Sequence, residues 1–335
     1  MRSELTPADR LSVVVPVYNE AENIGELFNQ LEGVLPRLAS EFEIIFVNDG
    51  SQDGSEEILN EMFHDHPFVS VIHMYKNFGK TPALEQGFEI ARGDIIATLD
   101  SDLQNVPEDL DGLVVKIREG YDLVSGQRQG RQDPRGKIMT SRIFNWIIRK
   151  TTGLEMYDYF SGMRCYRRKV LKALNLYGDL YRFALVFAHF DGFRVTEVPI
   201  GHHFRVHGDS KYSRYTRFKR GLSDLLIVLF TIKFNSRRVY LLGVWGAALT
   251  GLGFAFASLN IFLRLNESGG RGSVGLLSVG GILLFIGIQF LLFKKISDDF
   301  IRHHQTGREM RRKHIKEILR HPKTGGEAGF SFVAR

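Results

Sequence analysis

Residues 94–104 read DIIATLDSDLQ, an apolar run that ends in two acidic residues one position apart. The run is short and contains β-branched side chains, which is typical of a buried strand. Similar runs occur over 11–17, 42–48, 69–74 and 121–126, and helical patterns lie between them near 22–39, 54–65, 80–92 and 107–119. Strands and helices that alternate at this spacing form right-handed βαβ crossovers. The sequence therefore predicts an α/β fold, with a mostly parallel sheet flanked by helices.

Polar residues follow three of these strands, at the edge where such sheets bind ligands. The segments are PVYNE (16–20), NDGS (48–51) and DSDLQ (100–104). Carboxylates gathered at one edge repel one another unless they bind a cation, donate to a ligand or shift their pKa values. We expect Asp100, Asp102 and Gln104 to bind Mg²⁺ or Mn²⁺, because these ions prefer oxygen ligands. A solvated loop is the alternative, since D-x-D also occurs by chance.

Asp49 ends the second strand and precedes Gly50 and Ser51. This position suits a carboxylate that accepts hydrogen bonds from a ribose or a base. The alternative is an Asx turn, or a cap for the helix that follows Asp53. Neither G-x-x-x-x-G-K-[ST] nor G-x-G-x-x-G occurs, so phosphates would be held by a metal and by side chains.

The net charge of +6 is unevenly distributed along the chain. Residues 1–200 hold 22 basic and 30 acidic side chains, whereas 201–238 hold 9 and 2, and 294–335 hold 11 and 5. A nucleic-acid-binding protein would carry its positive charge on the folded domain, which is acidic here, so nucleic acid is not an expected partner. The single cysteine and the absence of an apolar N-terminal leader favour a reducing cytoplasm for the folded domain.

Two uncharged apolar runs lie near the C-terminal end, one of 25 residues over 239–263 and one of 22 over 272–293. As helices, both exceed the roughly 30 Å thickness of a bilayer core. We therefore predict two transmembrane helices over 239–293, the alternative being a buried pair in a soluble core. Their outer flanks carry Lys233, Arg237, Arg238, Lys294 and Lys295. This bias places both long ends in the cytoplasm, so we expect an integral protein of the inner membrane or its equivalent.

The segments beside the spans are basic. Residues 213–238 are expected to form an amphipathic juxtamembrane segment in the headgroup plane, or else an ordinary helix on the soluble domain. Residues 294–335 are expected to form a basic cytoplasmic tail with a solvated helix. Both spans are rich in glycine, which allows helices to approach closely within one chain or in a homo-oligomer.

Six motifs occur in order along the chain: PVYNE (16–20), NDGS with Asp53, KNFGK (76–80), DSDLQ with Pro107, SGMR (161–164) and RVHGDSKY (205–212). Together they resemble the family 2 glycosyltransferases of GT-A fold, and within these the membrane-bound polyprenyl-phosphate hexosyltransferases. The resemblance implies a GT-A-like catalytic domain over 1–212. It also implies inverting transfer of a hexose from a nucleotide sugar, with UDP-glucose and GDP-mannose as the leading pair, to a polyprenyl phosphate at the cytoplasmic face of the membrane.

The same resemblance implies roles for individual residues. The nucleotide sugar would contact Pro16, Tyr18, Glu20, Asp49, Lys80, Asp100 and Ser210. The acceptor phosphate would face Arg128, Arg142 and Arg164, and the catalytic group would comprise Asp158, Arg205 and Lys211. Asp158 is a candidate base or an acceptor-orienting carboxylate, with an ion pair to Arg164 or Arg168 as the alternative. A base is optional, because a phosphate monoester with a second pKa of about 6 is already a nucleophilic dianion at neutral pH.

Two rival functions are considered. A processive polysaccharide synthase of the same superfamily would have more membrane spans and a Q-x-x-R-W motif, and this sequence has neither. A non-catalytic adaptor that only binds a nucleotide sugar would not need Asp100, Asp102, Arg205 and Lys211 together.

Overall fold

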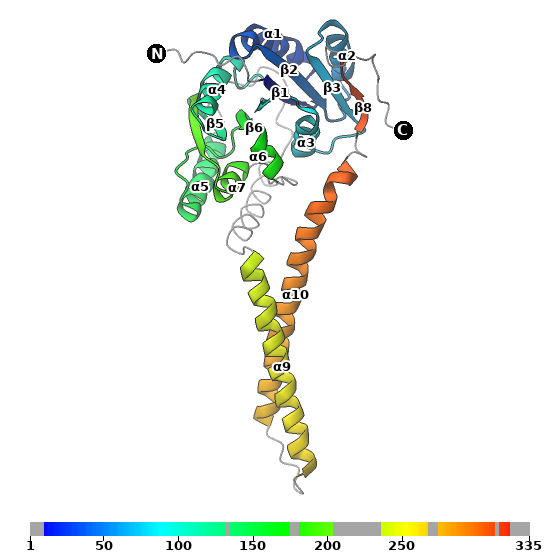
Figure 1. Ribbon diagram of the computed structural model, residues 1–335, viewed down its shortest axis with the longest axis vertical. Helices are drawn as coiled ribbons and strands as arrows, with labels where there is room; N and C mark the ends of the chain where they lie inside the picture. The colour runs from blue at the N-terminus through cyan, green and yellow to red at the C-terminus, as the bar shows by residue number, and fades with distance from the viewer. Residues whose placement is uncertain are drawn as a thin grey trace. The chain divides into compact units, whose positions relative to one another are not determined.

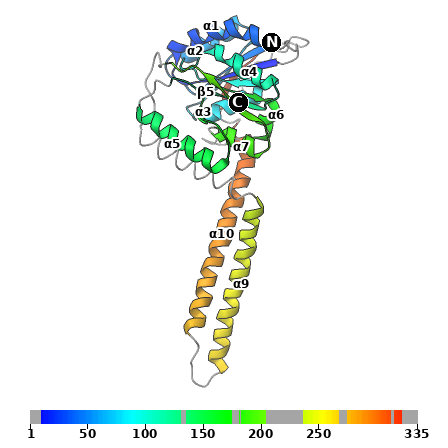
Figure 2. The same cartoon turned by 90° about the vertical axis from the view of Figure 1, so that its left-hand side faces the viewer.

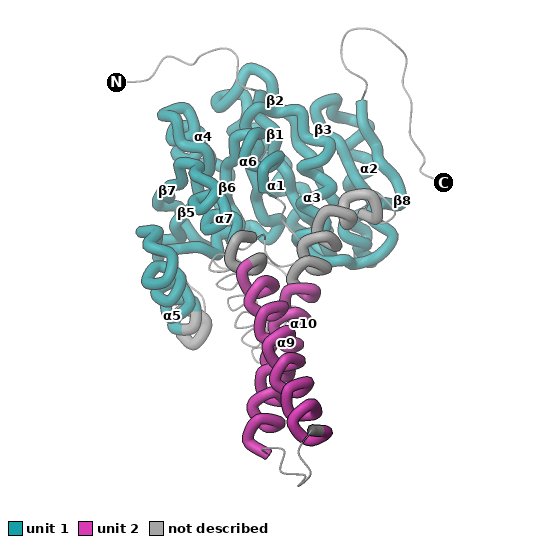
Figure 3. The backbone as a smooth tube through the Cα atoms, turned by 60° about the horizontal axis from the view of Figure 1, so that its bottom comes forward, with its two compact units in different colours: residues 1–228, 308–335 teal, residues 229–307 magenta. Residues whose placement is uncertain are grey.

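The computed structural model of the protein describes residues 10–130, 135–174, 181, 183–203, 236–266, 274–311 and 315–321. The chain forms two compact units, coloured separately in Figure 3. One unit comprises residues 1–228 together with 308–335, and the other comprises residues 229–307. The chain therefore leaves the first unit once and returns to it.

The first unit is built on one sheet, which has eight strands among the described residues. They are β1 (Arg10–Val17), β2 (Glu41–Asn48), β3 (Val69–Met74), β4 (Ile95–Thr98), β5 (Leu123–Arg128), β6 (Arg164–Arg167), β7 (Val195–Ile200) and β8 (Ile315–Leu319). The order across the sheet is β7-β5-β6-β4-β1-β2-β3-β8. Pairing is parallel except where β6 meets β4 and β5, and where β8 meets β3. The predicted mostly parallel α/β sheet is confirmed.

Helices cover both faces of this sheet (Figure 1). They are α1 (Ala21–Leu38), α2 (Ser55–Asp65), α3 (Lys80–Ile90), α4 (Leu110–Arg118), α5 (Arg135–Thr152), α6 (Arg168–Ala173) and α7 (Ala184–Phe190), with a 3₁₀ turn at Pro107–Asp109. Successive strand residues point to opposite faces. Val13 and Val15 share one buried core with side chains of α1, α2 and α4, whereas α3 packs against Val14 on the other face. Strands β1–β4 are thus buried on both sides, which explains their nearly continuous apolar sequences.

The last strand, β8, follows the two long apolar helices in sequence and pairs with the edge strand β3. Lys316 forms an ion pair with Glu56 of α2 at 2.8 Å. The ring of His321 stacks on Phe63 with centroids 4.2 Å apart. The segment expected to be a basic cytoplasmic tail over 294–335 therefore also supplies a strand of the sheet in the first unit.

The second unit contains α9 (Ser236–Asn266) and most of α10 (Val274–Arg311), whose last residues belong to the first unit. Within them, Leu241–Leu265 and Val274–Ile296 are long and apolar enough to cross a membrane. Only 17% and 11% of the most apolar windows are buried, whereas a pair of helices in a soluble core would be largely enclosed. The exposed apolar surface therefore favours the predicted transmembrane pair. Residues 213–235 of the expected juxtamembrane segment lie outside the described part of the chain.

Glycines bring α9 and α10 together. A Cβ on Gly253 would lie 2.9 Å from the carbonyl oxygen of Gly280, and one on Gly246 would lie 3.0 Å from that of Gly287. Larger side chains at these positions would push the backbones apart. The close approach that the glycine content predicts thus occurs within one chain, and a homo-oligomer remains a prediction.

Candidate active site

The carboxyl ends of four strands meet at one edge of the sheet. Strands β1, β2 and β4 are parallel neighbours. Strand β5 runs in the same direction, because β6 is antiparallel to both β4 and β5. This topology brings together the segments that follow Val17, Asn48, Thr98 and Arg128. Most of the predicted site residues within the described chain lie on these segments.

The segment after β1 is held by neighbouring loops. The Ser101 hydroxyl donates to the Pro16 carbonyl at 3.0 Å. The Glu20 amide donates to the Ser55 hydroxyl at 3.2 Å, and the Glu20 carboxylate accepts from Asn23 Nδ2 at 2.6 Å. Tyr18 is half-buried beside them. The PVYNE segment is thus tied to the loops after β2 and β4.

Asp49 is almost completely buried and holds the loop after β3. Its two carboxylate oxygens accept from the backbone amides of Phe78 and Gly79, each at 2.8 Å. Burial raises the pKa of Asp49 to about 6, although these two hydrogen bonds favour the ionised form. Asp49 therefore fixes the segment that leads into Lys80, and this role differs from both alternatives to nucleotide binding, an Asx turn and a cap for the helix after Asp53.

Asp100 forms an ion pair with Lys80, the first residue of α3. Burial alone would raise the pKa of Asp100, but Lys80, Arg128 and Arg164 outweigh it and lower the pKa. A Cβ on Gly162 would lie 2.3 Å from Asp100 Oδ2, so the SGMR segment passes directly against this carboxylate. The arrangement keeps Asp100 ionised at the edge of the sheet.

Asp102 is 8% exposed and accepts a hydrogen bond from the Gln104 amide at 3.3 Å. The Gln104 carbonyl accepts from the His203 amide at 2.8 Å. Within the described part of the chain, no group of three or more His, Cys, Asp or Glu side chains could enclose a metal. Two carboxylates still provide hard oxygen ligands, and this incomplete set fits an ion that takes its other ligands from a phosphate. The residues present therefore fit Mg²⁺ or Mn²⁺ bound together with a diphosphate.

Arg128 and Asp158 form a bidentate ion pair. Arg128 Nε donates to Asp158 Oδ2 at 2.7 Å, and a second guanidinium nitrogen donates to Oδ1 at 2.9 Å. Their side chains are only 12% and 6% exposed. The Asp158 amide donates to Glu197 of β7 at 3.1 Å. Asp158 thus forms an ion pair, which was the alternative to a role as a base. Its partner in this pair is Arg128 rather than the expected Arg164 or Arg168.

Arg164, which was predicted to face the acceptor phosphate, lies in the interior and is 1% exposed. Its guanidinium donates to the carbonyls of Tyr159 at 2.7 Å and Tyr181 at 2.8 Å. It also lies over the Tyr181 ring, 4.8 Å from the centroid. The prediction is corrected: Arg164 fixes two backbone segments and adds positive charge behind Asp100, and it does not reach the surface.

Arg142 lies on the exposed side of α5. The same helix exposes Met139, Ile143 and Trp146 by 63%, 52% and 57%, and it lies along the outside of the unit in Figure 2. These positions, at i, i+4 and i+7, share one helical face. On the inner side, Asn145 Nδ2 donates to the Tyr157 carbonyl at 2.6 Å. The helix is therefore joined to the segment that carries Asp158.

Three predicted residues, Arg205, Ser210 and Lys211, lie outside the described part of the chain. Two residues that sequence reasoning missed are Glu197, which accepts the Tyr157 and Asp158 amides, and Asn145. For Asn145 a signal existed in the amphipathic pattern of 135–152. For Glu197 the only signal in the sequence was that it is the one charged residue of an otherwise uncharged strand.

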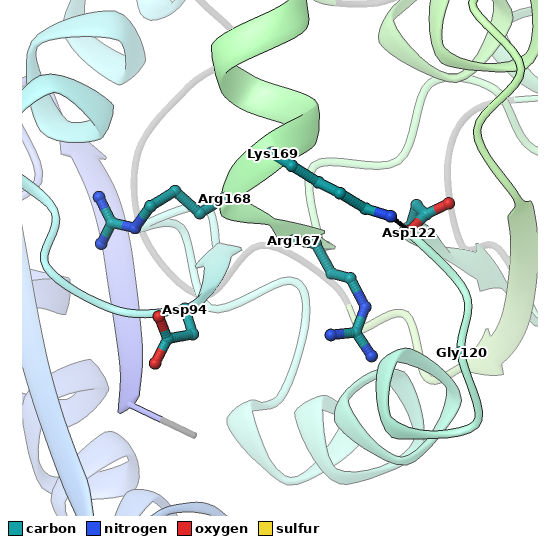
Figure 4. Close-up of a pocket in the computed structure, with 6 residues that line it drawn as sticks. All are labelled: Asp94, Gly120, Asp122, Arg167, Arg168 and Lys169. Carbon is teal, nitrogen blue, oxygen red and sulfur yellow. Dashed lines mark ion pairs between the residues drawn. The ribbon is translucent and has the colours of Figure 1, made fainter. Parts of the chain in front are cut away.

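A pocket of about 410 Å³ lies at the opposite edge of the sheet, and Figure 4 shows the side chains that line it. Its cationic groups already have partners in the fold. Arg167 donates to the Ile117 carbonyl at 2.6 Å, Arg168 to the Ala91 carbonyl at 2.9 Å, and Lys169 pairs with Asp122 at 2.7 Å. These contacts tie β6 and α6 to neighbouring elements, so we assign the pocket no role in the chemistry.

Comparison with solved structures identifies the fold. The chain is similar to the crystal structure of glucosyl-3-phosphoglycerate synthase from Mycobacterium tuberculosis in complex with Mn²⁺, UDP and glucosyl-3-phosphoglycerate. The TM-score is 0.52 and the identity 22%, with 66% of this chain and 80% of that chain covered. A likeness at this identity shows the GT-A fold and no more.

Sequence comparison identifies the family. A family model described as glycosyl transferase family 2 matches residues 12–174. The undecaprenyl-phosphate 4-deoxy-4-formamido-L-arabinose transferase of Pseudomonas fluorescens (strain Pf0-1) is 35% identical over 326 residues, with 96% of this chain and 94% of the relative covered. The protein of the same name from Klebsiella pneumoniae subsp. pneumoniae is 34% identical over 323 residues, with 96% and 97% covered. The chain therefore belongs to glycosyl transferase family 2 and, within it, to the polyprenyl-phosphate glycosyltransferases.

Proposed function

We propose that the chain transfers one sugar from a nucleotide diphosphate sugar to a polyprenyl phosphate at the cytoplasmic face of a membrane. An acceptor phosphate oxygen attacks the anomeric carbon and forms the new C–O bond. The bond from that carbon to the diphosphate breaks, and the nucleoside diphosphate leaves with the electron pair. Attack from the opposite face inverts the anomeric configuration.

The observation that carries this proposal is the grouping of Asp100, Asp102, Arg128 and Asp158 at one edge of the sheet. We call the segments after β1, β2, β3 and β4 the donor half, and β5–β7 with α5 the acceptor half. Acidic groups dominate the first half and would bind a metal diphosphate. A guanidinium at the end of β5 in the second would attract a phosphate monoester.

In the donor half, Asp100 and Asp102 would hold Mg²⁺ or Mn²⁺, with Gln104 beside them. The ion would supply positive charge to the departing diphosphate. Lys80 keeps Asp100 ionised and in place, and Asp49, Tyr18 and Glu20 would surround the nucleotide. By their motif, Arg205, Ser210 and Lys211 would close over the diphosphate, so Arg205→Ala is expected to weaken donor use more than folding.

In the acceptor half, Arg128 would bind the acceptor phosphate and Asp158 would hold the guanidinium in position. A carboxylate engaged by two guanidinium hydrogen bonds is a poor proton acceptor. The acceptor dianion needs no base, so orientation of Arg128 is the role that the ion pair supports. Arg142, exposed on α5, would attract the same anionic headgroup.

The acceptor is a lipid, and two features favour a membrane-bound reaction. The exposed stripe of Met139, Ile143 and Trp146 on a helix that also carries Arg142 and Arg149 suits the boundary between headgroups and acyl chains. The chain also leaves the sheet unit before α9 and returns to it at β8, so it must cross a bilayer an even number of times. Two spans meet that condition, and their basic flanks favour the cytoplasmic side.

The sugar expected from the motifs is a hexose carried by UDP or GDP. The relatives are named for 4-deoxy-4-formamido-L-arabinose, a pentose derivative, and this sugar belongs beside UDP-glucose and GDP-mannose in any test. The side chains that distinguish these sugars would contact the ring hydroxyls.

The test is transfer of radiolabelled sugar by purified full-length protein to polyprenyl phosphate, with Mg²⁺ or Mn²⁺ and these three nucleotide sugars. We expect a chloroform-soluble product that carries one sugar. A polymeric product would support a processive synthase instead. Nucleotide-sugar binding without transfer from any donor would support the non-catalytic adaptor.

A further inference from the structure

His73 is buried without any exposed surface in the last part of β3, beneath the donor half. Its ring lies between two asparagine side chains. Nδ1 is 3.1 Å from Asn48 Nδ2, and Nε2 is 3.0 Å from Asn60 Oδ1. Asn48 is the last residue of β2, directly before Asp49, and Asn60 lies on α2. The imidazole thus bridges a helix to the strand end that leads into the site.

The direction of each hydrogen bond follows from a third contact. Asn48 Oδ1 accepts from the Ser51 amide at 2.9 Å, so the Asn48 side-chain NH₂ must face the imidazole. His73 Nδ1 therefore accepts, and Nε2–H donates to Asn60. The arrangement requires the neutral Nε2–H tautomer, because a proton on Nδ1 would face another donor.

The charged groups around His73 come from two elements. Glu56 and Glu57 of α2 and Glu317 of β8 favour a proton on the ring, whereas Lys316 of β8 disfavours it. Burial is the largest influence and lowers the pKa of His73. The ring therefore remains neutral at physiological pH, as its hydrogen bonds require.

From Asn48 the hydrogen bonds continue into the donor half. The Ser51 hydroxyl accepts from the Asn19 amide at 2.9 Å, and Asn19 Oδ1 accepts from the Gln52 amide at 2.8 Å. These contacts join the segment after β1 to the segment after β2. Gly50 has φ +68°, and a Cβ there would lie 2.5 Å from the backbone of Lys76. The segments after β1, β2 and β3 therefore meet where the Asn48 side chain is fixed.

We infer that His73 is a positioning residue for the nucleotide, acting through Asn48, Ser51 and Asn19 to hold the segments after β1 and β2 in their binding geometry. The inference rests on the proposed function, since it takes a nucleotide sugar as the ligand of the donor half. His73 itself does not touch the ligand.

Two conservative variants separate this role from a purely structural one. In His73→Asn the amide occupies the place of Nδ1 and can accept from Asn48, while the bond to Asn60 is lost. In His73→Gln the longer side chain reaches the place of Nε2 and can donate to Asn60, while the bond to Asn48 is lost. Each variant thus loses one buried hydrogen bond, and their melting temperatures should fall by similar amounts.

The measurement is calorimetric binding of UDP and of GDP, each with MnCl₂, to the full-length protein in detergent. We expect His73→Gln to weaken binding of the nucleotide that the wild type prefers by about tenfold, which corresponds to ~1.4 kcal/mol. His73→Asn should stay within about twofold of the wild type, because the link to Asn48 remains. Phe63→Leu serves as a control, since it disturbs the stacking with His321 but leaves the contacts of Asn48 unchanged.

Equal weakening by both His73 variants, or no weakening by either, would overturn the inference. If neither variant folds, Ser51→Ala decides the question, because it removes the acceptor of the Asn19 amide near the surface. We expect it to weaken nucleotide binding several-fold, and unchanged affinity would overturn the inference. A wild-type protein that binds neither UDP nor GDP would instead overturn the proposed donor, an outcome that is distinguishable because it appears before any variant is made.

Discussion

The donor half and the acceptor half of the proposed site are built in different ways. In the donor half, side chains such as Asn19, Ser51 and Asp49 hydrogen-bond to the backbone of neighbouring loops, so the loops support one another. The acceptor half depends on one buried ion pair, Arg128 with Asp158, beside a helix with an exposed apolar face. The first design suits a small rigid ligand that must be bound in one orientation. The second suits a phosphate on a long mobile chain, which must be fixed only at its headgroup.

The largest expected effect comes from breaking the donor half at its metal site. Asp102→Asn should lower transfer by about a thousandfold, because an amide binds a divalent cation weakly and the leaving diphosphate loses its counter-charge. The fold and membrane insertion should remain intact. Asp111→Asn, an exposed carboxylate on α4, is the matched control. Activity of Asp102→Asn close to that of the wild type would refute the metal assignment.

Breaking the ion pair should damage the acceptor half alone. Asp158→Asn should lower kcat by about a hundredfold through misplacement of Arg128, and it should destabilise the fold by about 3–5 kcal/mol because a buried charge loses its partner. Calorimetry should show unchanged nucleotide affinity. Arg128→Met combined with Asp158→Leu should recover stability but not transfer. A double variant that also regains transfer would show that the pair has only a structural role.

Removing apolar side chains from the exposed face of α5 should have a smaller effect on transfer. Met139→Ser with Trp146→Ser should raise the KM for polyprenyl phosphate by about tenfold, since partial burial of two such side chains in lipid is worth roughly 1.4 kcal/mol. The donor KM should not change. Phe190→Ser, which removes another exposed apolar side chain, controls for a general loss of surface apolarity. An equal effect from Phe190→Ser would remove α5 from the proposal.

The smallest effect is a pH dependence confined to the donor half. As the pH falls below about 6, Asp49 gains a proton. The neutral carboxyl group then accepts weaker hydrogen bonds from the backbone amides of Phe78 and Gly79 than the carboxylate does. Binding of the nucleotide sugar should weaken by about threefold between pH 7 and pH 5. The diphosphate of a nucleotide sugar is a diester and lacks the second ionisation of a monoester, so the ligand does not contribute. The profile of Asp49→Asn should be flat, and a sloping one would assign the titration to another group.

The free energy of unfolding should depend on the protonation of Asp49 in the opposite sense to nucleotide binding. Its folded pKa of about 6 lies above the ordinary aspartate value of 3.8, so the folded state binds the proton more tightly than the unfolded state does. The stabilisation is therefore full below pH 3.8 and is lost as the pH rises through 6. Acid would strengthen the fold at this residue while weakening donor binding.

The central part of the fold was predictable because strands β1–β5 each carry their own signal. Runs such as DIIATLD contain enough apolar and β-branched residues to predict a strand, and the polar residues that follow them predict the edge used for binding. The helices expected near 22–39 and 54–65 form as α1 and α2 with small shifts at their ends. Local pattern was sufficient wherever a segment's structure depends on its own residues.

The remaining features depend on partners distant in sequence. From its motif, Arg164 was expected to face the acceptor phosphate, but the carbonyls of Tyr159 and Tyr181 accept hydrogen bonds from its buried guanidinium. Asp158 finds Arg128 30 residues earlier, although nearer arginines were available. Five residues in a basic tail, IKEIL, give no hint that β3 is their partner. Burial and pairing of this kind arise from the topology, which single motifs do not encode.

The position of β8 after the apolar helices has a consequence for biosynthesis. The ribosome makes β3 long before it makes residues 315–319, so the outer edge of β3 has no neighbour until both apolar helices have emerged. An unpaired strand edge can join another chain during that interval. Completion of the sheet also requires the last segment to be on the same side of the membrane as the first. A nascent chain that inserted only one helix would leave its final strand across the bilayer from β3, so only a chain that inserts both helices can complete the sheet.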